Sequence, residues 1–590
     1  MKKRKASCSL LALFLVVSFS SCRKEKPSSE QPSVNAMAAR VTALADEYLK
    51  EALSRYPEWA EFLGLAGAPH DRLTDNSLEA LQAWQEKEDR WSAELSRIDA
   101  SSLWGRPEWL TYGCLREIVE ASRAERIARS ELWPINHMSG RQAVFARLAA
   151  IQPVGTPEKR AQALARWHMV PYLLDTEISN LREGLRLGYT APKLTVRLTI
   201  GQLDALLGAP VEQSPFFSPA IRDETPEFRA AWQKLLTDEI NPAIRRYRDF
   251  LDKEYLPGAR DSIGISALPN GSEIYRVLFR SMTTLDRPAE ETFKLGQEAV
   301  QRYEAEAAAI GREIAGSADL AVIRAKIASD PANYFRTREE LLAFNRDAVD
   351  RARQAMPQWF LTVPKAEVVI EPIPDFLEKT ASSGYEPPAA DGSRPGTYLI
   401  NLYQPEKQKR SSAEITAFHE TYPGHHFQIS MAAERTAGHL ITQLPASGGY
   451  IEGWARYSEA LAEEMGLYSS AYSRVARRLW PAHGMVVDPG IHVMGWTRQR
   501  AIDFIFATGS FSEHVAESII DRVIAMPAQL TSYDTGALEF FALRKKAEEA
   551  LGARFDIKAF HDQLLKYGSV TLPMLREVIE RWIADKGSNR

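Results

Sequence analysis

Cysteine is scarce in this chain, with three residues in 590. So few thiols exclude a disulfide framework. Cys114 lies in an apolar segment, Trp109-Leu110-Thr111-Tyr112-Gly113-Cys114-Leu115, and we expect it to be a small buried residue without a catalytic role. An excess of positive charge is also missing, because the formal net charge is −4. A mildly acidic protein argues against nucleic acid as a partner, since phosphate binding needs a basic face.

Long apolar runs are lacking as well, and the main apolar stretch stands near the N-terminus. Leu10 to Val17 is too short to span a bilayer as a permanent helix. It follows basic residues at positions 2–5 and precedes small residues and Cys22, so residues 1–21 are predicted to be an export signal. Small residues before a cysteine resemble a bacterial lipobox, in which the cysteine is lipidated. Phe19 departs from the usual aliphatic residue, and ordinary secretion is the alternative. We therefore expect an exported cell-envelope lipoprotein, held at the outer membrane or facing the periplasm by a lipid on Cys22.

Beyond the signal, the chain is long and apolar enough, at 45% hydrophobic residues, to bury a large core. Residues 22–40 begin as a polar, Pro/Ser-rich stretch and are predicted to be a tether. Helical periodicity then predicts a mainly α protein, with an N-terminal helical region at 41–265 and a catalytic region at 266–590 that form one integrated unit. The clearest amphipathic segments are 41–55, 78–98, 157–187, 226–255, 289–314 and 338–356.

Two short β-branched segments, 366–370 and 396–402, predict a small sheet beside the helix that follows them. The edge of such a sheet can hold an extended peptide backbone; the alternative is a purely structural sheet. A Pro/Gly/Ser-rich loop is predicted between the strands, at 386–395.

The segment richest in histidine is His419-Glu420-Thr421-Tyr422-Pro423-Gly424-His425-His426, with three of the eleven histidines in eight residues. Imidazole suits Zn²⁺ and the adjoining carboxylate suits a general base, so the pattern indicates a hydrolytic zinc site. Ser411 and Glu414 form a capping-box pattern and predict a helix from about Ser412 to Gly438. The zincin signature has its second histidine four residues after the first. Pro423 stands there instead, and with Gly424 it predicts a kink or bulge.

Either His425 or His426 is the second histidine ligand. In a regular helix His426 shares the face of His419 but lies about 10.5 Å further along the axis. His425 points away from that face unless the helix widens by two residues. Widening at Pro423 favours His425, with His426 as the alternative; the histidine left over would support a ligand or face the substrate.

Glu452 is the best candidate for the third ligand, in a predicted helix that follows Gly448-Gly449. Glu459 falls on the same helical face seven residues later and would orient a ligand. The alternative for Glu452 is a surface pair with Arg456, four residues on.

The chain resembles a large family of bacterial proteins, often exported or lipid-anchored, that is defined as a domain of unknown function. The resemblance extends over about residues 41–585. Besides His-Glu-Thr-Tyr-Pro-Gly-His-His and Glu-Gly-Trp-Ala, similar segments are Leu268-Pro269-Asn270-Gly271, Asp391-Gly392-Ser393-Arg394-Pro395-Gly396-Thr397, Asp488-Pro489-Gly490-Ile491-His492, Gly495-Trp496-Thr497 and Ser532-Tyr533 with Gly536.

This resemblance implies a gluzincin-like metallopeptidase with a two-lobed helical body around a deep channel, similar to angiotensin-converting enzyme, thimet oligopeptidase-type enzymes and Taq-type carboxypeptidases. It implies that His419, His425 (or His426) and Glu452 hold zinc and that Glu420 is the base. It further suggests Tyr533 and His492 as the groups that stabilise the oxyanion.

The sequence therefore predicts a zinc-dependent peptidase that hydrolyses short peptides at the cell envelope, with Glu420 activating the attacking water. Two alternatives remain open. One is a lipid-anchored, metal-containing binding protein without catalysis, which the presence of Glu420 disfavours. The other is a zinc amidohydrolase for a non-peptide amide, because zinc, base and oxyanion donor serve any acyl transfer to water.

Overall fold

The computed structural model describes residues 33–588, apart from residue 66 and residues 374–377, 379–381, 389–394, 436–437 and 445–446. The predicted signal peptide and Cys22 lie outside the described residues. The first described helix begins at Val34 after a Ser33 cap, whose hydroxyl accepts a hydrogen bond from the Ala36 amide. The end of the segment predicted as a tether is therefore helical. None of the described helices combines the length and apolarity needed to cross a bilayer.

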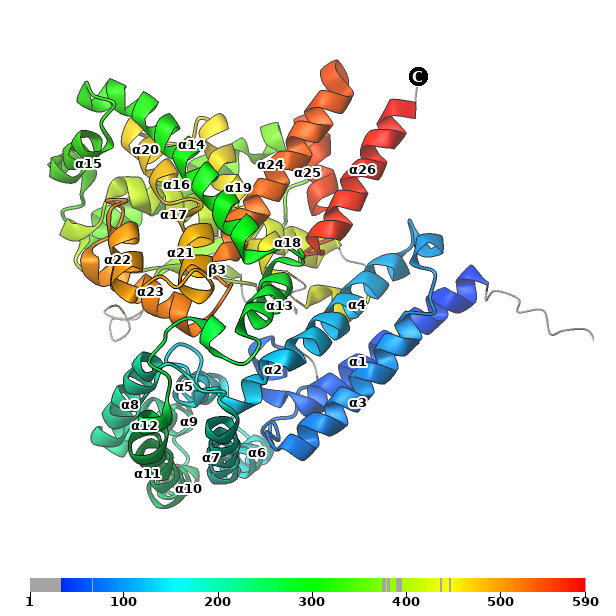
Figure 1. Ribbon diagram of the computed structural model, residues 1–590, viewed down its shortest axis with the longest axis vertical. Helices are drawn as coiled ribbons and strands as arrows, with labels where there is room; N and C mark the ends of the chain where they lie inside the picture. Colours follow the sequence, from blue (N-terminus) through cyan, green and yellow to red (C-terminus); the bar gives the residue numbers. More distant parts are fainter. Residues whose placement is uncertain are drawn as a thin grey trace, which may run out of the picture.

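Helices make up most of the described chain, as the sequence predicts, and Figure 1 shows how they are grouped. The N-terminal helices are α1 (Val34–Arg55), α2 (Pro57–Phe62), α3 (Leu78–Leu95) and α4 (Pro107–Glu125). A lower group contains α5 (Arg141–Ile151), α6 (Pro157–Trp167), α7 (Val170–Leu187), α8 (Lys193–Gly208), α9 (Ser218–Arg222), α10 (Pro226–Leu235), α11 (Asn241–Phe250) and α12 (Leu256–Gly258).

The upper group carries the histidine-rich segment. It contains α13 (Gly271–Thr283), α14 (Ala289–Ala315), α15 (Leu320–Ser329), α16 (Arg338–Trp359), α17 (Arg410–Glu420), α18 (His425–Arg435), α19 (Gly448–Glu464), α20 (Ala471–Leu479), α21 (His483–His492), α22 (Arg498–Phe506), α23 (Glu513–Ala525), α24 (Thr531–Leu551), α25 (Ile557–Leu565) and α26 (Leu572–Ser588).

Separate apolar cores hold these groups together. The largest joins α1, α3 and α4 to the upper group, with Trp91 and Trp454 fully buried in it. A second core belongs to the lower group, where the rings of Trp167 and Trp232 meet edge to face at 5.2 Å. The N-terminal helices thus pack with the part of the chain that carries the histidines, while the lower group has a core of its own.

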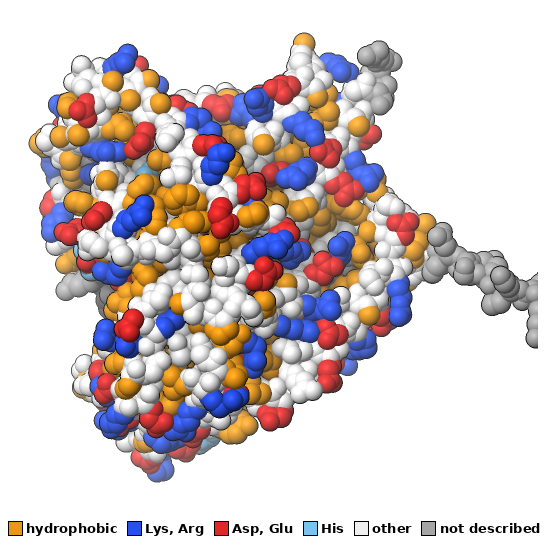
Figure 2. Space-filling view, in the orientation of Figure 1, with side chains coloured by type: hydrophobic (Ala, Val, Ile, Leu, Met, Phe, Trp, Pro, Cys, Tyr) orange, Lys and Arg blue, Asp and Glu red, His pale blue; other side chains and the backbone are white. Residues whose placement is uncertain are grey.

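Both signs of charge are mixed over the face shown in Figure 2. Apolar side chains gather along the middle of that face, where the lower group of helices meets the upper group.

Most predicted amphipathic segments are helices in the structure, and their ends follow local chemistry. The segment 157–187 divides into α6 and α7, and 226–255 divides into α10 and α11 with π-helical turns at Leu236–Ile240 and Leu251–Tyr255. The helix predicted from 412 to 438 is wrong as a single element, because it is divided into α17 and α18.

A small sheet lies in the upper group, and two of its strands confirm the predicted strand segments. Its strands are β1 (Val368–Pro372), β2 (Gly384–Glu386) and β3 (Gly396–Ile400), in the order β1-β3-β2. β1 pairs with β3 in parallel, with Ile370 opposite Tyr398, and β2 pairs with β3 antiparallel, with Tyr385 opposite Tyr398. β2 was not predicted from the sequence.

Candidate metal centre

The histidine-rich segment breaks the helix completely instead of only bending it. α17 ends at Glu420, the Tyr422–Pro423 peptide bond is cis, and α18 begins at His425. Position 424 has room only for glycine, because a Cβ there would overlap the carbonyl oxygens of His419 and Phe418. The indole of Trp454 on α19 donates a hydrogen bond to the carbonyl of Pro423 (2.9 Å) and fixes the connection.

The predicted capping box does not form. The Glu414 carboxylate is buried and instead accepts hydrogen bonds from Arg351 (2.7 Å) and Ser473 (2.6 Å). Ser411 is also fully buried, and its amide donates a hydrogen bond to the Asn333 side chain (3.2 Å). Both residues therefore tie α17 to neighbouring elements and leave the helix end uncapped.

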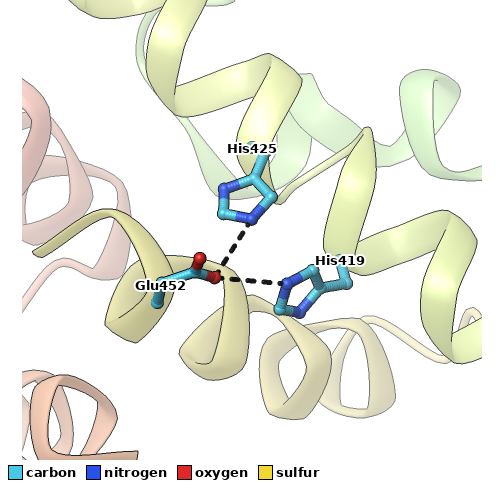
Figure 3. A group of neighbouring side chains, drawn as sticks. All are labelled: His419, His425 and Glu452. Atoms are coloured by element: carbon cyan, nitrogen blue, oxygen red, sulfur yellow. Dashed lines mark ion pairs between the residues drawn. The ribbon is translucent and has the colours of Figure 1, made fainter. Parts of the chain in front are cut away.

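The break brings His419, His425 and Glu452 together (Figure 3). One potential ligand atom from each lies within 4.8 Å of the other two. Nε2 of His425 is 3.4 Å, and Nε2 of His419 is 3.7 Å, from Oε2 of Glu452. The two imidazole rings stand perpendicular with their centroids 4.7 Å apart. The side chains come from the end of α17, the start of α18 and the first turns of α19.

His426, the alternative ligand, is directed elsewhere. Its Nε2 donates to the carbonyl of Ala366 (3.0 Å), and its Nδ1 accepts a hydrogen bond from the Tyr385 hydroxyl (2.9 Å). Burial lowers the pKa of His426 to about 4, so the ring is neutral at pH 7. With both nitrogens occupied, His426 joins α18 to the sheet and is not available as a ligand.

Glu459 lies behind His419, as its helical position predicts. Its Oε1 accepts a hydrogen bond from Nδ1 of His419 (2.8 Å), which leaves Nε2 facing Glu452. Arg456 donates to both oxygens of Glu459 (2.9 Å each) and lies 3.5 Å from Asp534 on α24. The alternative of a surface pair between Glu452 and Arg456 is therefore wrong, since Arg456 is buried against two other carboxylates.

The electrostatics of the cluster favour a positive charge at its centre. Burial alone would lower the pKa of His419, but the carboxylates of Glu452 and Glu459 outweigh it and raise the pKa to about 10. Burial would raise the pKa of Glu452, but the facing imidazoles of His419 and His425 hold it well below its usual range. A pocket that stabilises an added proton in this way is electronegative.

Glu420 and Tyr533 border the cluster. The Glu420 carboxylate lies near the buried Tyr398 of β3, whose pKa is raised by burial and further by this negative charge. Within the described residues Glu420 has no hydrogen-bond or ion-pair partner. The ring of Tyr533, on α24, stacks on His419 with centroids 6.3 Å apart, and its hydroxyl accepts a hydrogen bond from Arg522 (3.2 Å).

His492 is not part of the centre, which corrects its predicted role at the oxyanion. The side chain is fully buried, its Nδ1 accepts a hydrogen bond from the Ile265 amide (3.2 Å), and its Nε2 donates to the Val523 carbonyl (2.9 Å). Neither nitrogen is free to meet a substrate, so this imidazole holds α21 against its neighbours.

The helices α19 and α24 approach closely at the centre. A Cβ on Gly453 would come within 2.6 Å of the Gly536 backbone, and a Cβ on Gly536 would overlap the carbonyl of Gly449. The contact brings the helix that carries Glu452 directly against the helix that carries Tyr533 and Asp534.

The donor set fits zinc. Two imidazoles and one carboxylate form a three-residue set typical of catalytic zinc sites, which keep a further position open. Ligand atoms about 2.0–2.2 Å from a tetrahedral zinc lie roughly 3.3–3.5 Å apart, close to the 3.4 and 3.7 Å seen here. Oε2 of Glu452, the oxygen that faces both imidazoles, is buried without a hydrogen-bond partner. A buried carboxylate oxygen left unpaired is costly, so the pocket has the properties of a cation site.

Sequence reasoning missed two members of this centre, Arg456 in its buried role and Asp534. Arg456 lies three residues before Glu459, a spacing that places both on one helical face and was a usable signal. Nothing near Asp534 in the sequence marks it, because its contact with Arg456 depends on how α24 packs against α19.

Comparisons with known proteins agree with this architecture. The family described as "Bacterial protein of unknown function (DUF885)" matches residues 57–579. A "putative lipoprotein" from Colwellia psychrerythraea shares the fold with a TM-score of 0.84 at 22% identity, covering 94% of this chain and 100% of its own. A "putative lipoprotein of unknown function" from Shewanella oneidensis has a TM-score of 0.75 at 20% identity, covering 93% of this chain and 100% of its own. No curated protein matches significantly. The chain therefore belongs to the bacterial DUF885 family.

Proposed function

We propose that this protein is a zinc-dependent peptidase that hydrolyses short peptides. The observation that carries the proposal is the cluster of His419, His425 and Glu452, in which ligand atoms from three helices converge and the buried Oε2 of Glu452 lacks a hydrogen-bond partner. A general base next to the first histidine completes the set of groups that metal-assisted hydrolysis needs.

Each residue of the centre has a separate task in this mechanism. His419, His425 and Glu452 hold the metal, and Glu459 keeps His419 in the tautomer that presents Nε2. When bound, zinc supplies Lewis acidity, which lowers the pKa of water to about 7 and polarises a carbonyl oxygen. Glu420 takes a proton from the attacking water and returns it to the leaving amine. Tyr533 donates a hydrogen bond from its hydroxyl to the oxyanion, while Arg522 holds the phenol oxygen.

The proposal includes the cell envelope as the site of action. Residues 1–22 have the features of an export signal that ends at a lipidated cysteine. Each of the two similar solved structures is described as a "putative lipoprotein", which supports the same anchoring for this chain.

Metal analysis and peptide hydrolysis, measured together, test the proposal. The purified protein should contain zinc at a one-to-one ratio and cleave members of a fluorogenic peptide library, and a chelator should abolish cleavage until zinc is restored. Glu420→Gln should keep its zinc and lose about 10²- to 10⁴-fold in turnover. Glu406→Gln, at an exposed position of the short turn before α17, is the matched control and should be unaffected.

The alternatives give different results in the same assays. A binding protein would hold zinc without cleaving any peptide, and Glu420→Gln would change nothing. An amidohydrolase would leave peptides intact but cleave small non-peptide amides, with the same loss in Glu420→Gln. Absence of stoichiometric zinc after metal loading would contradict the central assignment.

A further inference from the structure

A cavity adjoins the metal centre on the side of α20. It is enclosed by α15, α17, α19, α20 and the segment Gly509–Phe511, and its volume is about 140 Å³. About 10–15 Å³ of such volume holds one water molecule, so there is room for a side chain and a charged group. Arg456 and Glu459, the pair behind His419, form part of its wall.

Unequal charge distinguishes this cavity. Arg324, Lys409, Arg456 and Arg477 line it, against one carboxylate, Glu459. The three arginines have acidic partners: Arg324 with Glu304 at 3.3 Å, Arg456 with Glu459 at 2.9 Å and Arg477 with Glu463 at 2.6 Å. These pairs neutralise most of the positive charge.

Lys409 is the exception. No carboxylate of the described residues lies within 4.0 Å of its ammonium group, which donates one hydrogen bond, to the carbonyl of Gly509 (3.1 Å). An ammonium has three hydrogens to donate, so two remain for a ligand. Burial lowers the pKa of Lys409, because desolvation disfavours its charged form. The ammonium group of Lys409 can therefore bind a negatively charged oxygen in the cavity.

Part of the remaining wall is apolar and part carries hydroxyl groups. Ile415, Leu479, Trp480 and Phe511 line the cavity, and the rings of Trp480 and Phe511 meet edge to face at 4.9 Å. A ligand that combines a carboxylate with a neighbouring hydrophobic side chain matches both features, whereas a small inorganic anion would leave the apolar walls unfilled.

Residues of α17 both line the cavity and reach the metal centre, so their spacing along the helix gives the distance between the two sites. Thr416 and Ser412 line it, three and seven residues before His419 and on the same helical face. They lie about 4.5 and 10.5 Å from His419 along the helix axis. Lys409 precedes His419 by ten residues, which is about 15 Å along the axis. An extended peptide advances about 3.3 Å per residue, so a carboxylate at Lys409 lies about four to five residues from the metal centre.

We propose that this cavity is a substrate subsite in which Lys409 binds a peptide carboxylate about four to five residues from the scissile bond, with the apolar part of the wall holding the adjoining side chain. This subsite rests on the proposed peptidase function and deepens it. The carboxylate comes either from the C-terminus of the peptide or from an Asp or Glu side chain. The first source predicts release of fragments of about four to five residues from the C-terminus, and the second predicts internal cleavage at a fixed distance from an acidic residue.

Matched peptides distinguish the two sources. One set carries the same sequence with a free or an amidated C-terminus, and a second set is amidated and carries Glu or Gln at successive positions. With the zinc-loaded protein, we expect kcat/KM to be about ten- to a hundred-fold higher for peptides with the recognised carboxylate, the range expected of a charged hydrogen bond. Mass spectrometry of the products locates the cut.

Variants of Lys409 test whether the preference for carboxylate peptides depends on this cavity. Lys409→Gln should remove the preference by slowing cleavage of the carboxylate peptides while leaving the neutral peptides unchanged, and Lys409→Arg should retain most of it. Lys407→Gln, at an exposed lysine two residues earlier, is the control and should keep the full preference. Circular dichroism verifies that each variant is folded.

The subsite and the peptidase proposal fail in different ways. If the wild type cleaves charged and neutral peptides equally, or if Lys409→Gln keeps the preference, the subsite is refuted and the peptidase stands. If no peptide is cleaved, the peptidase is refuted, and calorimetry with the zinc-loaded Glu420→Gln protein decides on the cavity alone. Tighter binding of the carboxylate peptide, lost in a Glu420→Gln, Lys409→Gln double variant, supports the subsite; equal binding of both peptides overturns it.

Discussion

Replacing Glu459 with Gln tests whether the buried pair behind His419 holds the metal centre. The substitution keeps the shape of the side chain but removes the charge that faces Nδ1 of His419 at 2.8 Å. Loss of such a partner typically weakens metal binding about 10- to 100-fold. Arg456 keeps at most one of its two contacts of 2.9 Å, because Gln has a single acceptor oxygen, although Asp534 remains at 3.5 Å. Breaking a buried ion pair costs about 3–5 kcal/mol, and because Asp534 remains we expect about 3 kcal/mol.

Two measurements separate these effects. Competition with a chromogenic chelator gives the zinc affinity, and urea unfolding of the metal-free protein gives the stability. Glu464→Gln is the matched control on the same helix, because it breaks only a partly exposed pair with Arg544 (2.8 Å), which is worth about 0–1 kcal/mol and is remote from the histidines. Unchanged zinc affinity in a folded Glu459→Gln protein would refute the role assigned to Glu459.

Three further predictions follow from the same geometry. Gly424→Ala should abolish zinc binding, measured by metal analysis, because the added methyl overlaps the carbonyls of His419 and Phe418 and must move one ligand away from the other; retained zinc would show that the connection can yield. Tyr533→Phe should lower kcat about 10²- to 10³-fold with little change in KM, whereas loss in KM alone would indicate binding without a part at the oxyanion. Burial lowers the pKa of His492 to about 4, so between about pH 6.5 and pH 4 the unfolded chain binds a proton that the folded chain does not. The free energy of unfolding should therefore fall as the pH is lowered through this window, by up to about 3 kcal/mol from this residue, and urea titrations of a His492→Asn variant should show a weaker dependence.

The sequence predicted most of the centre because its signals were local. Seven residues contain His419, Glu420 and His425. Pro423 and Gly424, between them, indicated that a regular helix could not continue through the segment. The preference for His425 over His426 followed from helix geometry and agrees with their positions in the structure. Glu459 was found because the period of a helix places it on the face of Glu452.

What the sequence could not predict depended on contacts between distant segments. His492 was proposed from a resemblance of short segments, and only the packing of α21 shows that both its nitrogens are used by backbone groups. The apparent capping box at Ser411 and Glu414 failed for the same reason, since Arg351 and Ser473 approach Glu414 from elsewhere in the fold. The strand β2 is three residues long and was too short to give a pattern.

The contact between Gly453 and Gly536 has a consequence for how such a centre evolves. The two glycines let the backbones of α19 and α24 touch, and these helices carry Glu452 and Tyr533. Any side chain larger than hydrogen at either position would push the phenol outward, and a displacement of about 1 Å at a reacting group can reduce turnover about a hundredfold. If the protein is the proposed peptidase, its turnover would then fall although Glu452 and Tyr533 were still present, so a weakly active relative need not have lost either residue.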